Sequence, residues 1–400
     1  MNIRVLVISH MYPSSFNEVS GIFVHEQVKA LMEKGVEIKV ISPVPWVPFP
    51  INQMSAKWKA YSQIPFQSSR DGIEVYCPRY LEFPKAMFFA SSGQRMYWGI
   101  RNPVGKIHSE FPFSLIHAHV ALPDGFAAMG LKEKYHMPLV VTMHGQDLQV
   151  TLYRNARCKR ALVKVLGQAD RVIVVSTKLK NIAQDEIGYA EKIIVINNGI
   201  TPEKLSSGRG SLMLNHECIV ILSVSNLVAS KGIDLNLVAI SKLIEKYPKL
   251  KYVVIGDGPE MKYLVELASN LGLTDHVEFL GRLPHNKVIG YMAVADVFSL
   301  PSWEEGFGVV YLEAMAQGKP VIACRGEGIE DVVTDGETGI LVKPKDVNSL
   351  AKAMDYLLSH PDEANEMGQR AKELVLEHYT WEKNAEKTIK VYEEVLNSGR

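Results

Sequence analysis

Short apolar runs alternate with stretches of helical periodicity along nearly the whole chain. The runs are rich in Val and Ile, as is typical of buried strands. In the first half they occupy residues 3–8, 37–41, 115–118, 139–143, 171–175 and 193–196. In the second half they occupy residues 218–224, 251–255, 277–279, 297–300 and 320–323. This alternation predicts an α/β fold in which helices cover parallel sheets.

A stretch rich in Gly, Ser and Pro separates the two series of runs. It covers residues 201–210 and is the best candidate for a linker between domains. The 400 residues also exceed what one hydrophobic core usually serves. We therefore expect two Rossmann-like, doubly wound domains that face each other across a cleft. They are expected at residues 1–205 and 206–380, with a helix at about 381–400 that packs back on the first domain.

The composition is that of an ordinary globular protein whose charges cancel. Apolar residues make up 47%, and 44 Lys and Arg are balanced by 44 Asp and Glu. This balance excludes a generic polyanion binder. Four widely spaced cysteines favour a reducing compartment and form no zinc motif. The first apolar run is too short for a signal peptide, and no apolar stretch reaches the length of a bilayer span. We expect a cytoplasmic chain, either soluble or at a membrane surface.

The segment 300–323 carries the strongest chemical signal. A strand, a glycine-containing turn and a helix follow one another in it. Glu305 in the turn and Glu313 in the helix can each accept hydrogen bonds from the hydroxyl groups of one ligand. The backbone amides of residues 307–310 at the helix start can face an anion. This combination suits a nucleotide sugar, although Glu304 and Glu305 could instead simply stabilise the positive end of the helix.

This segment resembles the Glu, seven residues, Glu motif of the retaining GT-B glycosyltransferases of family four. The resemblance extends over nearly the whole chain, through Met11-Tyr-Pro with Gly21, His117-Ala-His119, Thr142-Met-His-Gly-Gln-Asp147, Ile196-Asn-Asn-Gly199, residues 223–232, Gly256-Asp-Gly-Pro259 and Phe279-Leu-Gly-Arg282. It implies a GT-B fold and a nucleotide diphosphate sugar as donor. It also implies that Glu305 binds the hydroxyl groups of the donor sugar and that Glu313 binds the ribose. The amides that would bind sugar and phosphate belong to Gly306, Phe307, Gly308 and Val309.

Lys231 lies between a predicted strand and a predicted helix. A cation there can stabilise the charge that grows on a departing diphosphate. The alternative is a solvated surface lysine. The resembled family usually places an Arg shortly before this lysine, where this chain has Asn226. The usual pair of cations is therefore incomplete, and Arg282 or Arg325 could supply the second charge.

Two glycines follow the predicted strand at residues 251–255. Gly256 and Gly258 begin a G-x-G pattern, but Met261 stands where a dinucleotide motif needs its third glycine. An NAD oxidoreductase is therefore the least favoured reading. By resemblance, these glycines let the backbone approach a nucleotide closely. The alternative is a tight turn from strand to helix.

Polar residues also follow the predicted strands of the first half. Gly21 lies in the loop after the first strand, where a close approach of the donor phosphate would need a small residue. His119, and then His144 with Asp147, follow two further strands, at the edge where α/β sheets bind ligands. By resemblance, His119 is a catalytic residue near the transferred sugar, and His144 and Asp147 lie near the acceptor or the sugar. The alternative is that the histidines are structural, and we expect His117 to point the other way.

Charge is divided unevenly between the two halves. Residues 1–205 contain 24 Lys and Arg with 16 Asp and Glu, whereas residues 206–400 contain 20 and 28. Residues 43–70, 83–109 and 148–169 lack acidic side chains and mix basic with aromatic ones. This pattern suits an anionic membrane surface or a lipid-linked acceptor. The alternative is local packing with solvated charges, and no nucleic-acid motif accompanies the pattern.

Metal-binding and nucleophile motifs are not found. The sequence has no D-x-D triplet, no H-E-x-x-H and no G-x-S-x-G, so we expect no metal and no cofactor apart from the donor substrate.

The sequence therefore predicts a retaining hexosyltransferase that uses a nucleotide diphosphate sugar and a saccharide or lipid-linked acceptor. A role in cell-envelope or exopolysaccharide synthesis, in the cytoplasm or at the inner face of the membrane, follows by analogy. Two alternatives stay open: a GT-B nucleotide-sugar epimerase, and a catalytically silent partner that binds a sugar nucleotide. The base (UDP, GDP or ADP), the sugar, the acceptor and the oligomeric state are not predicted.

Overall fold

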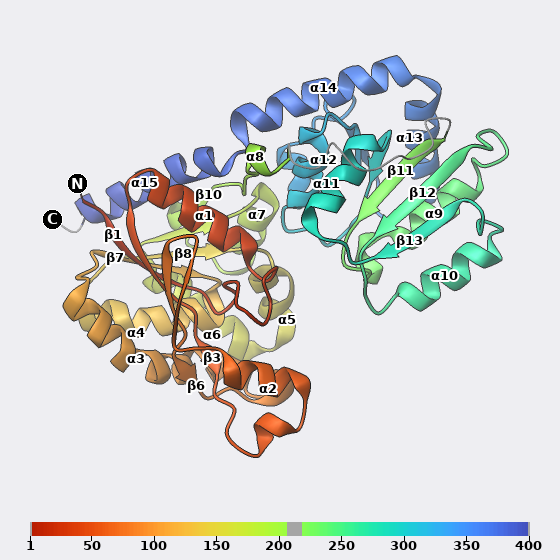
Figure 1. Ribbon diagram of the computed structural model, residues 1–400. Coiled ribbons are helices and arrows are strands. Elements are labelled where there is room, and N and C mark those ends of the chain that lie inside the picture. The colour runs from red at the N-terminus through yellow and green to blue at the C-terminus, as the bar shows by residue number, and fades with distance from the viewer. Residues whose placement is uncertain (1, 206–217, 399–400) are drawn as a thin grey trace. The chain divides into compact units, whose positions relative to one another are not determined.

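The computed structural model describes residues 2–205 and 218–398 and divides into two units (Figure 1). Unit 1 comprises Met1–Asn197 with Trp381–Arg400, and unit 2 comprises Asn198–Thr380. The boundary therefore lies at Asn197 and not at residue 205. The reason is helix α8 (Pro202–Leu205), which contacts helices of unit 2 and whose Leu205 carbonyl accepts a 3.0 Å hydrogen bond from Gln317. The predicted linker beyond Leu205 lies outside the described residues.

Unit 1 is built on an eight-stranded sheet with the order β10-β9-β8-β7-β1-β2-β5-β4. All neighbours are parallel except β4 and β5. A short parallel pair, β3 and β6, lies outside this sheet. The strands are β1 (Arg4–Ile8), β2 (Glu37–Ile41), β3 (Val44–Pro45), β4 (Gln67–Arg70), β5 (Ile73–Tyr76), β6 (Arg79–Tyr80), β7 (Leu115–His119), β8 (Leu139–Met143), β9 (Arg171–Val174) and β10 (Ile193–Val195).

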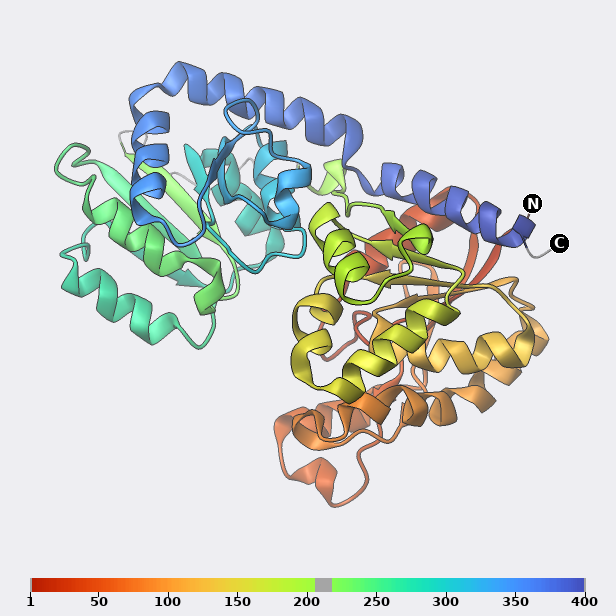
Figure 2. The ribbon, with the colours of Figure 1, turned by 180° about the vertical axis from the view of Figure 1, so that it is seen from behind.

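Helices cover both faces of this sheet, as Figures 1 and 2 show from opposite sides. Helices α1 and α15 contact each other on one face, and α3, α4 and α6 pack together on the other. The core under α1 and α15 includes Val5 and Val7 of β1 together with Trp381 and Tyr392 of α15. The last helix thus completes the core of the first unit. The helices are α1 (Ile22–Glu33), α2 (Ala56–Gln63), α3 (Ser92–Glu110), α4 (Phe126–Tyr135), α5 (Leu152–Arg154), α6 (Ala156–Gln168), α7 (Thr177–Glu186) and α15 (Trp381–Ser398).

Unit 2 is built on a six-stranded, wholly parallel sheet with the order β13-β12-β11-β14-β15-β16. The chain runs outward from β11 in one direction and then from β14 in the other, so the strand order reverses between these two strands. Ligands of doubly wound sheets bind at the carboxyl edge of such a reversal. The strands are β11 (Ile219–Val224), β12 (Leu250–Ile255), β13 (Val277–Gly281), β14 (Val297–Ser299), β15 (Val321–Cys324) and β16 (Ile340–Val342). The further helices are α9 (Ile233–Ser241), α10 (Met261–Asn270), α11 (His285–Val294), α12 (Val309–Ala316), α13 (Val347–Ser359) and α14 (Pro361–His378).

The structure confirms the expected fold class. Each strand predicted from the sequence is present, with ends within two residues of the expected ones. The short strands β3 to β6 and the edge strand β16 were not predicted. None of the helices formed by residues 2–205 and 218–398 combines the length and the apolar character that a bilayer span requires.

Candidate functional site

The candidate donor site of unit 2 begins with two loops that touch backbone to backbone. Gly256 follows β12 with φ 138°, and a Cβ atom there would lie 1.8 Å from the carbonyl oxygen of Ser225 after β11. A Cβ atom at Gly258 would lie 2.4 Å from the carbonyl oxygen of Leu227. The two loops also share a 3.0 Å hydrogen bond from the Leu227 amide to the Asp257 carbonyl. Both glycines are therefore needed for the tight turn itself, whether or not a nucleotide approaches them.

Lys231 and Glu305 meet at this edge. Lys231 ends the short 3₁₀ turn Ala229–Lys231, and Glu305 lies in the loop after β14. The Lys231 Nζ donates a 2.6 Å hydrogen bond to Glu305 Oε2, and the two side chains are 20% and 14% exposed. The structure thus brings together two of the residues predicted to be catalytic. Lys231 is not a solvated surface lysine.

A second carboxylate supports the Glu305 loop. The buried Glu327 accepts a 2.6 Å hydrogen bond through its Oε2 from the Glu305 amide. The next residue, Gly328, packs so closely that a Cβ atom there would lie 2.1 Å from the Gly306 carbonyl oxygen. Glu327 therefore fixes the backbone that carries Glu305. The sequence alone does not reveal Glu327, because no motif marks a residue that acts through tertiary contact alone.

Helix α12 begins at Val309, directly after Gly308, which adopts the left-handed conformation with φ 90°. Its Glu313 is 18% exposed and pairs with His285 at the start of α11, with 2.8 Å between Oε1 and Nε2. This pairing was not predicted. Phe307, in the loop before α12, is buried.

Neither Arg282 nor Arg325, the candidates for a second cation beside Lys231, forms a hydrogen bond or an ion pair with Lys231 or Glu305. Asn226 is exposed in the loop that carries Lys231. Arg282 lies 4.0 Å from a carboxylate oxygen of Asp257 and is 75% exposed. Arg325 pairs with Asp335. Arg325 is thus bound to a carboxylate, whereas Arg282 is largely exposed and makes no close contact with Asp257.

A buried polar network holds the strands beneath this site. Asn236 of α9 donates to the Ser223 hydroxyl and to the Tyr252 hydroxyl, both at 3.0 Å, and accepts a 2.8 Å bond from the Ser299 hydroxyl. These four residues join β11, β12, β14 and α9 at their core. Because buried polar groups are costly when unpaired, a fully bonded network of this kind fixes the strand ends.

The polar residues of unit 1 gather at the carboxyl ends of β7 and β8. The His119 Nδ1 lies 3.1 Å from the His144 Nε2, and the two rings are stacked with centroids 5.3 Å apart. Burial lowers the pKa of His144 to about 3 and that of His119 well below its ordinary value. Both rings are therefore neutral at pH 7, so one nitrogen donates and the other accepts.

Asp147, at the same edge of the sheet, has a buried carboxylate oxygen without a hydrogen-bond partner among the residues that the structure describes. Its side chain is 2% exposed, and its Oδ1 accepts a 2.8 Å bond from the Ala121 amide. Its Oδ2, like the His144 Nδ1, has no hydrogen-bond partner within residues 2–205 and 218–398. Burial raises the pKa of Asp147 to about 6, against the opposing effect of the backbone amides of Ala121 and Leu122. Buried atoms without partners mark this edge as a place for a polar ligand.

His10 and Asp124 form a further pair that the sequence did not reveal. His10 follows β1, and its Nδ1 lies 2.9 Å from Oδ2 of the fully buried Asp124. The His10 amide also donates to both carboxylate oxygens at 3.2 Å. Burial disfavours the imidazolium, but the Asp124 carboxylate outweighs it, and the pKa of His10 is raised. A spacing of 114 residues hides such a pair from motif reading.

Gly21 is required by the conformation of its own loop. It has φ 60°, and a Cβ atom there would lie 2.1 Å from the Met11 carbonyl oxygen, so only a residue without a side chain fits.

The expectation that His117 points away from His119 is wrong. Residues two apart on a strand share a face, and the two rings lie 4.4 Å apart. His117 is bound to Tyr392 and Thr142, each at 2.7 Å, and is a structural histidine.

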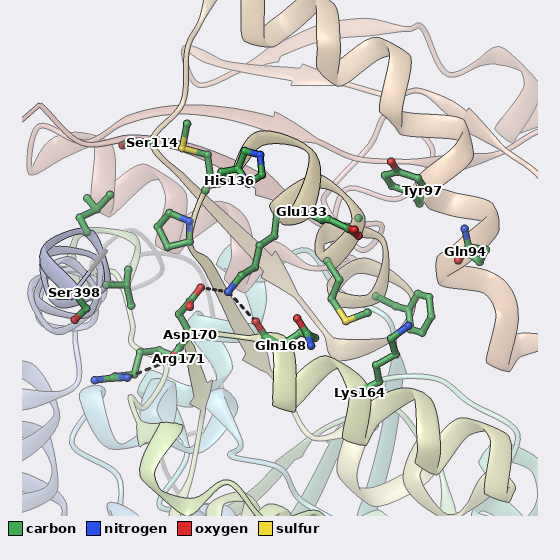
Figure 3. Close-up of a pocket in the computed structure, with 18 residues that line it drawn as sticks. Gln94, Tyr97, Ser114, Glu133, His136, Lys164, Gln168, Asp170, Arg171 and Ser398 are labelled. Carbon is green, nitrogen blue, oxygen red and sulfur yellow. Dashed lines mark hydrogen bonds and ion pairs between the residues drawn. The ribbon is translucent and has the colours of Figure 1, made fainter. Parts of the chain in front are cut away.

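A cavity of about 1060 Å³ lies at the opposite edge of the unit 1 sheet (Figure 3). Its lining includes Ser114, Pro138 and Asp170, at the amino ends of β7, β8 and β9. Within it, Lys132 donates to Asp170 at 2.6 Å and to the Gln168 carbonyl at 2.9 Å. Its polar groups thus satisfy one another, away from the candidate site residues. Residues 2–205 and 218–398 contain no group of three His, Cys, Asp or Glu side chains placed to hold a metal ion.

Two doubly wound units of this kind define the GT-B class, and solved structures share the fold. Sucrose-phosphate synthase from Thermosynechococcus elongatus matches with a TM-score of 0.82 and 23% identity, over 99% of this chain and 100% of that one. Anabaena Alr3699/HepE, solved in complex with UDP, matches with a TM-score of 0.75 and 19% identity, over 98% and 100%. The fold is that of the GT-B glycosyltransferases.

Sequence relatives identify the family. The model of Glycosyltransferase Family 4 matches residues 20–204, and that of Glycosyl transferases group 1 matches residues 209–374. TuaC of Bacillus subtilis (strain 168), named as a glycosyltransferase of teichuronic acid biosynthesis, is 31% identical over 360 residues, 88% of each chain. The N-acetyl-alpha-D-glucosaminyl L-malate synthase of Bacillus anthracis is 28% identical over 95% of each chain. The chain belongs to glycosyltransferase family 4 and is a nucleotide-sugar glycosyltransferase of the GT-B type.

Proposed function

We propose that this glycosyltransferase moves a hexose from a nucleotide diphosphate sugar to a saccharide or lipid-linked acceptor, with retention of the anomeric configuration and without a metal ion. The observation that carries the proposal is the 2.6 Å contact between Lys231 and Glu305 at the strand-order reversal of unit 2. A cation and a hydroxyl-binding carboxylate are the two groups that a sugar diphosphate needs there.

The chemistry assigned to unit 2 follows from these contacts. Before the donor binds, Glu305 compensates the charge of the half-buried lysine. A bound diphosphate competes for that lysine, which frees carboxylate oxygens of Glu305 to accept hydroxyl groups of the sugar. Glu313 accepts hydrogen bonds from the ribose hydroxyl groups. Hydrogen bonds to the sugar and the phosphate come from the backbone amides of Gly306, Phe307, Gly308 and Val309. Gly256 and Gly258 shape the nucleotide side of the site.

The transfer step needs no protein nucleophile. The bond between the anomeric carbon and the phosphate oxygen breaks while the acceptor oxygen bonds to that carbon from the same face. The acceptor proton passes to the leaving phosphate, and Lys231 stabilises the charge that develops there. His119, His144 and Asp147 of unit 1 contribute hydrogen bonds to the sugar or the acceptor, and Gly21 lets the donor phosphate approach.

The biological setting belongs to the same proposal. TuaC is named for teichuronic acid biosynthesis, and a relative from Mycolicibacterium smegmatis, 29% identical over 61% of this chain, is named as a GDP-mannose-dependent phosphatidylinositol monomannoside mannosyltransferase. These names support a role in cell-envelope or exopolysaccharide synthesis, with the protein in the cytoplasm at the inner face of the membrane. The exposed aromatic and basic side chains of unit 1 support the same setting.

The first experiment finds the donor. A thermal-shift screen with UDP, GDP and ADP sugars should show one base that raises the unfolding temperature, because a ligand that binds only the folded state stabilises it. With that donor, Glu305→Gln or Lys231→Ala should lower turnover by about a hundredfold or more, as loss of one transition-state contact does. Glu304→Gln, an exposed neighbour, is the matched control.

Product analysis tests the remaining parts. NMR of the product should show the anomeric configuration of the donor, and activity should survive EDTA. Unchanged turnover in both Glu305→Gln and Lys231→Ala would contradict the assignment, an inverted product would contradict retention, and loss of activity in EDTA would contradict metal independence. Conversion of the donor sugar without any acceptor would indicate an epimerase instead.

A further inference from the structure

Two adjoining grooves lie on unit 1, on elements that the proposed reaction does not use. The first, called here the apolar groove, has a volume of about 870 Å³. Its lining includes Trp46, Tyr80, Leu81, Phe83, Phe88 and Trp98. Trp46, Phe88 and Trp98 are 54%, 63% and 63% exposed, although large aromatic side chains are normally buried.

The cations that line the apolar groove are already engaged. Arg79 donates to the carbonyl oxygen of Tyr61 at 2.7 Å. Arg95 pairs with Glu82 at 3.2 Å and donates to the Leu81 carbonyl at 2.9 Å. These arginines tie the groove to the body of unit 1, and its exposed surface is left apolar.

The second groove, called here the cationic groove, has a volume of about 650 Å³. Four of its lining residues are basic, namely Arg154, Arg157, Arg160 and Lys164, and none of its lining residues is acidic. Within the described part of the chain, Arg157 and Arg160 have no carboxylate partner. Three of the four cations lie on α6, which packs its apolar side into the core and turns these side chains outward.

The two grooves are continuous. Phe88 and Ser91 line both of them. The segment between them is held in an unusual backbone shape, because Lys85, Ala86 and Phe88 all have φ between 53° and 54°. Non-glycine residues adopt this region at a cost, so the fold maintains a conformation that leaves Met87 and Phe88 more than half exposed.

The sequence around the two grooves is also basic and rich in exposed apolar side chains. Residues 43–109 contain eight Lys and Arg and three Asp and Glu. The loop before α2 also exposes Phe49 and Met54, at 75% and 77%. In both ribbon views this part of unit 1 projects away from α15 (Figures 1 and 2). Exposed aromatic and apolar side chains beside unpaired cations are the composition of surfaces that lie at the headgroup level of a bilayer.

We propose that the apolar and cationic grooves together form a docking surface for a bilayer rich in anionic phospholipid. Trp46, Phe88 and Trp98 enter the boundary between headgroups and acyl chains, and Arg157, Arg160 and Lys164 contact lipid phosphates. Charge complementarity selects this partner, because the cationic groove is lined by four basic side chains and by no acidic one. The proposal deepens the function proposed above and rests on it for the use of a lipid-linked acceptor, but the binding of vesicles does not depend on catalysis.

The test measures binding of the full chain to vesicles in the absence of donor and acceptor. Flotation with phosphatidylcholine vesicles containing 30% phosphatidylglycerol should carry the protein upward, and pure phosphatidylcholine should not. Each cation near an anionic surface contributes about fivefold to partitioning, so Arg157→Gln with Arg160→Gln should lower the partition coefficient by roughly 25-fold. Trp98→Ser with Phe88→Ser should weaken binding at high salt as well as at low salt.

A matched control comes from unit 2. Tyr263 is exposed on α10 beside the exposed Lys262, and Tyr263→Ser with Lys262→Gln should leave vesicle binding unchanged. Unfolding temperatures equal to that of the wild type show that the variants fold. Equal binding to neutral and anionic vesicles, or wild-type binding by the double arginine variant, would overturn the proposal. Self-association that disappears in the Trp98 and Phe88 variant, without vesicle binding, would assign the surface to a second copy of the chain instead.

Discussion

The buried Asp147 allows a quantitative prediction about pH and stability. Its pKa is raised from 3.8 to about 6, chiefly by burial. The folded state therefore retains a proton on Asp147 that the unfolded chain has already lost. Stability from this group is full below pH 3.8 and falls as the pH rises to about 6. At about 1.4 kcal/mol for each pKa unit, the loss is about 3 kcal/mol.

Asp147→Asn removes this titration and keeps an oxygen to accept the Ala121 amide. The variant should differ little from the wild type at pH 4, and should gain about 3 kcal/mol relative to it by pH 7. Urea unfolding followed by tryptophan fluorescence measures this difference. Four of the five tryptophans, Trp46, Trp58, Trp98 and Trp381, lie in unit 1, so the signal reports mainly on the unit that holds Asp147.

The difference in stability between Asp147→Asn and the wild type separates the effect of Asp147 from that of the buried histidines. His117 and His144, whose pKa values burial lowers to about 3, destabilise the fold at low pH in both proteins, and their effect cancels in the difference. Asp185→Asn, an exposed carboxylate on α7, is the control and should show no comparable change. A difference between Asp147→Asn and wild type that is the same at pH 4 and pH 7 would refute the reasoning.

Two further predictions concern unit 2. Gly256→Ala should destabilise the protein by about 3 kcal/mol or more, because its Cβ would lie 1.8 Å from the Ser225 carbonyl oxygen. Gly272→Ala, with φ 71° and no atom within 4 Å, should cost only about 1 kcal/mol in the same thermal unfolding assay; equal losses would show that close packing does not matter at Gly256. Asn226→Arg should tighten binding of the donor nucleotide about fivefold at low salt, as about 1 kcal/mol from an exposed charge allows. Isothermal titration calorimetry measures this change. An affinity that neither the substitution nor salt alters would show that position 226 does not lie near the diphosphate.

The sequence predicts the strands of both units well, because apolar residues dominate most of the buried strands. It misses β3 and β6, which have two residues each, the polar β4, β5, in which Glu74 interrupts the apolar residues, and β16, a three-residue strand at the sheet edge. Likewise, it predicts Glu305 and Lys231 through their motifs but not their direct contact. Glu327, His285, His10 and Asp124 contribute only through partners that are distant in sequence. For such residues, the fold itself must be known before any of them can be linked to the site.

The position of helix α15 in the sequence determines when unit 1 can finish folding during synthesis. Unit 2 is one continuous stretch, so all of its core residues exist once Thr380 has been added. Unit 1 must wait for the final helix, which supplies Trp381, Tyr392 and Val395 to its core and the hydroxyl that binds His117. The half of the protein that is made first is therefore the half that finishes folding last. Until residues 381–398 have been added, the part of this core that α15 covers stays open to water, and a nascent chain that stalls before them would expose it to chaperones and proteases.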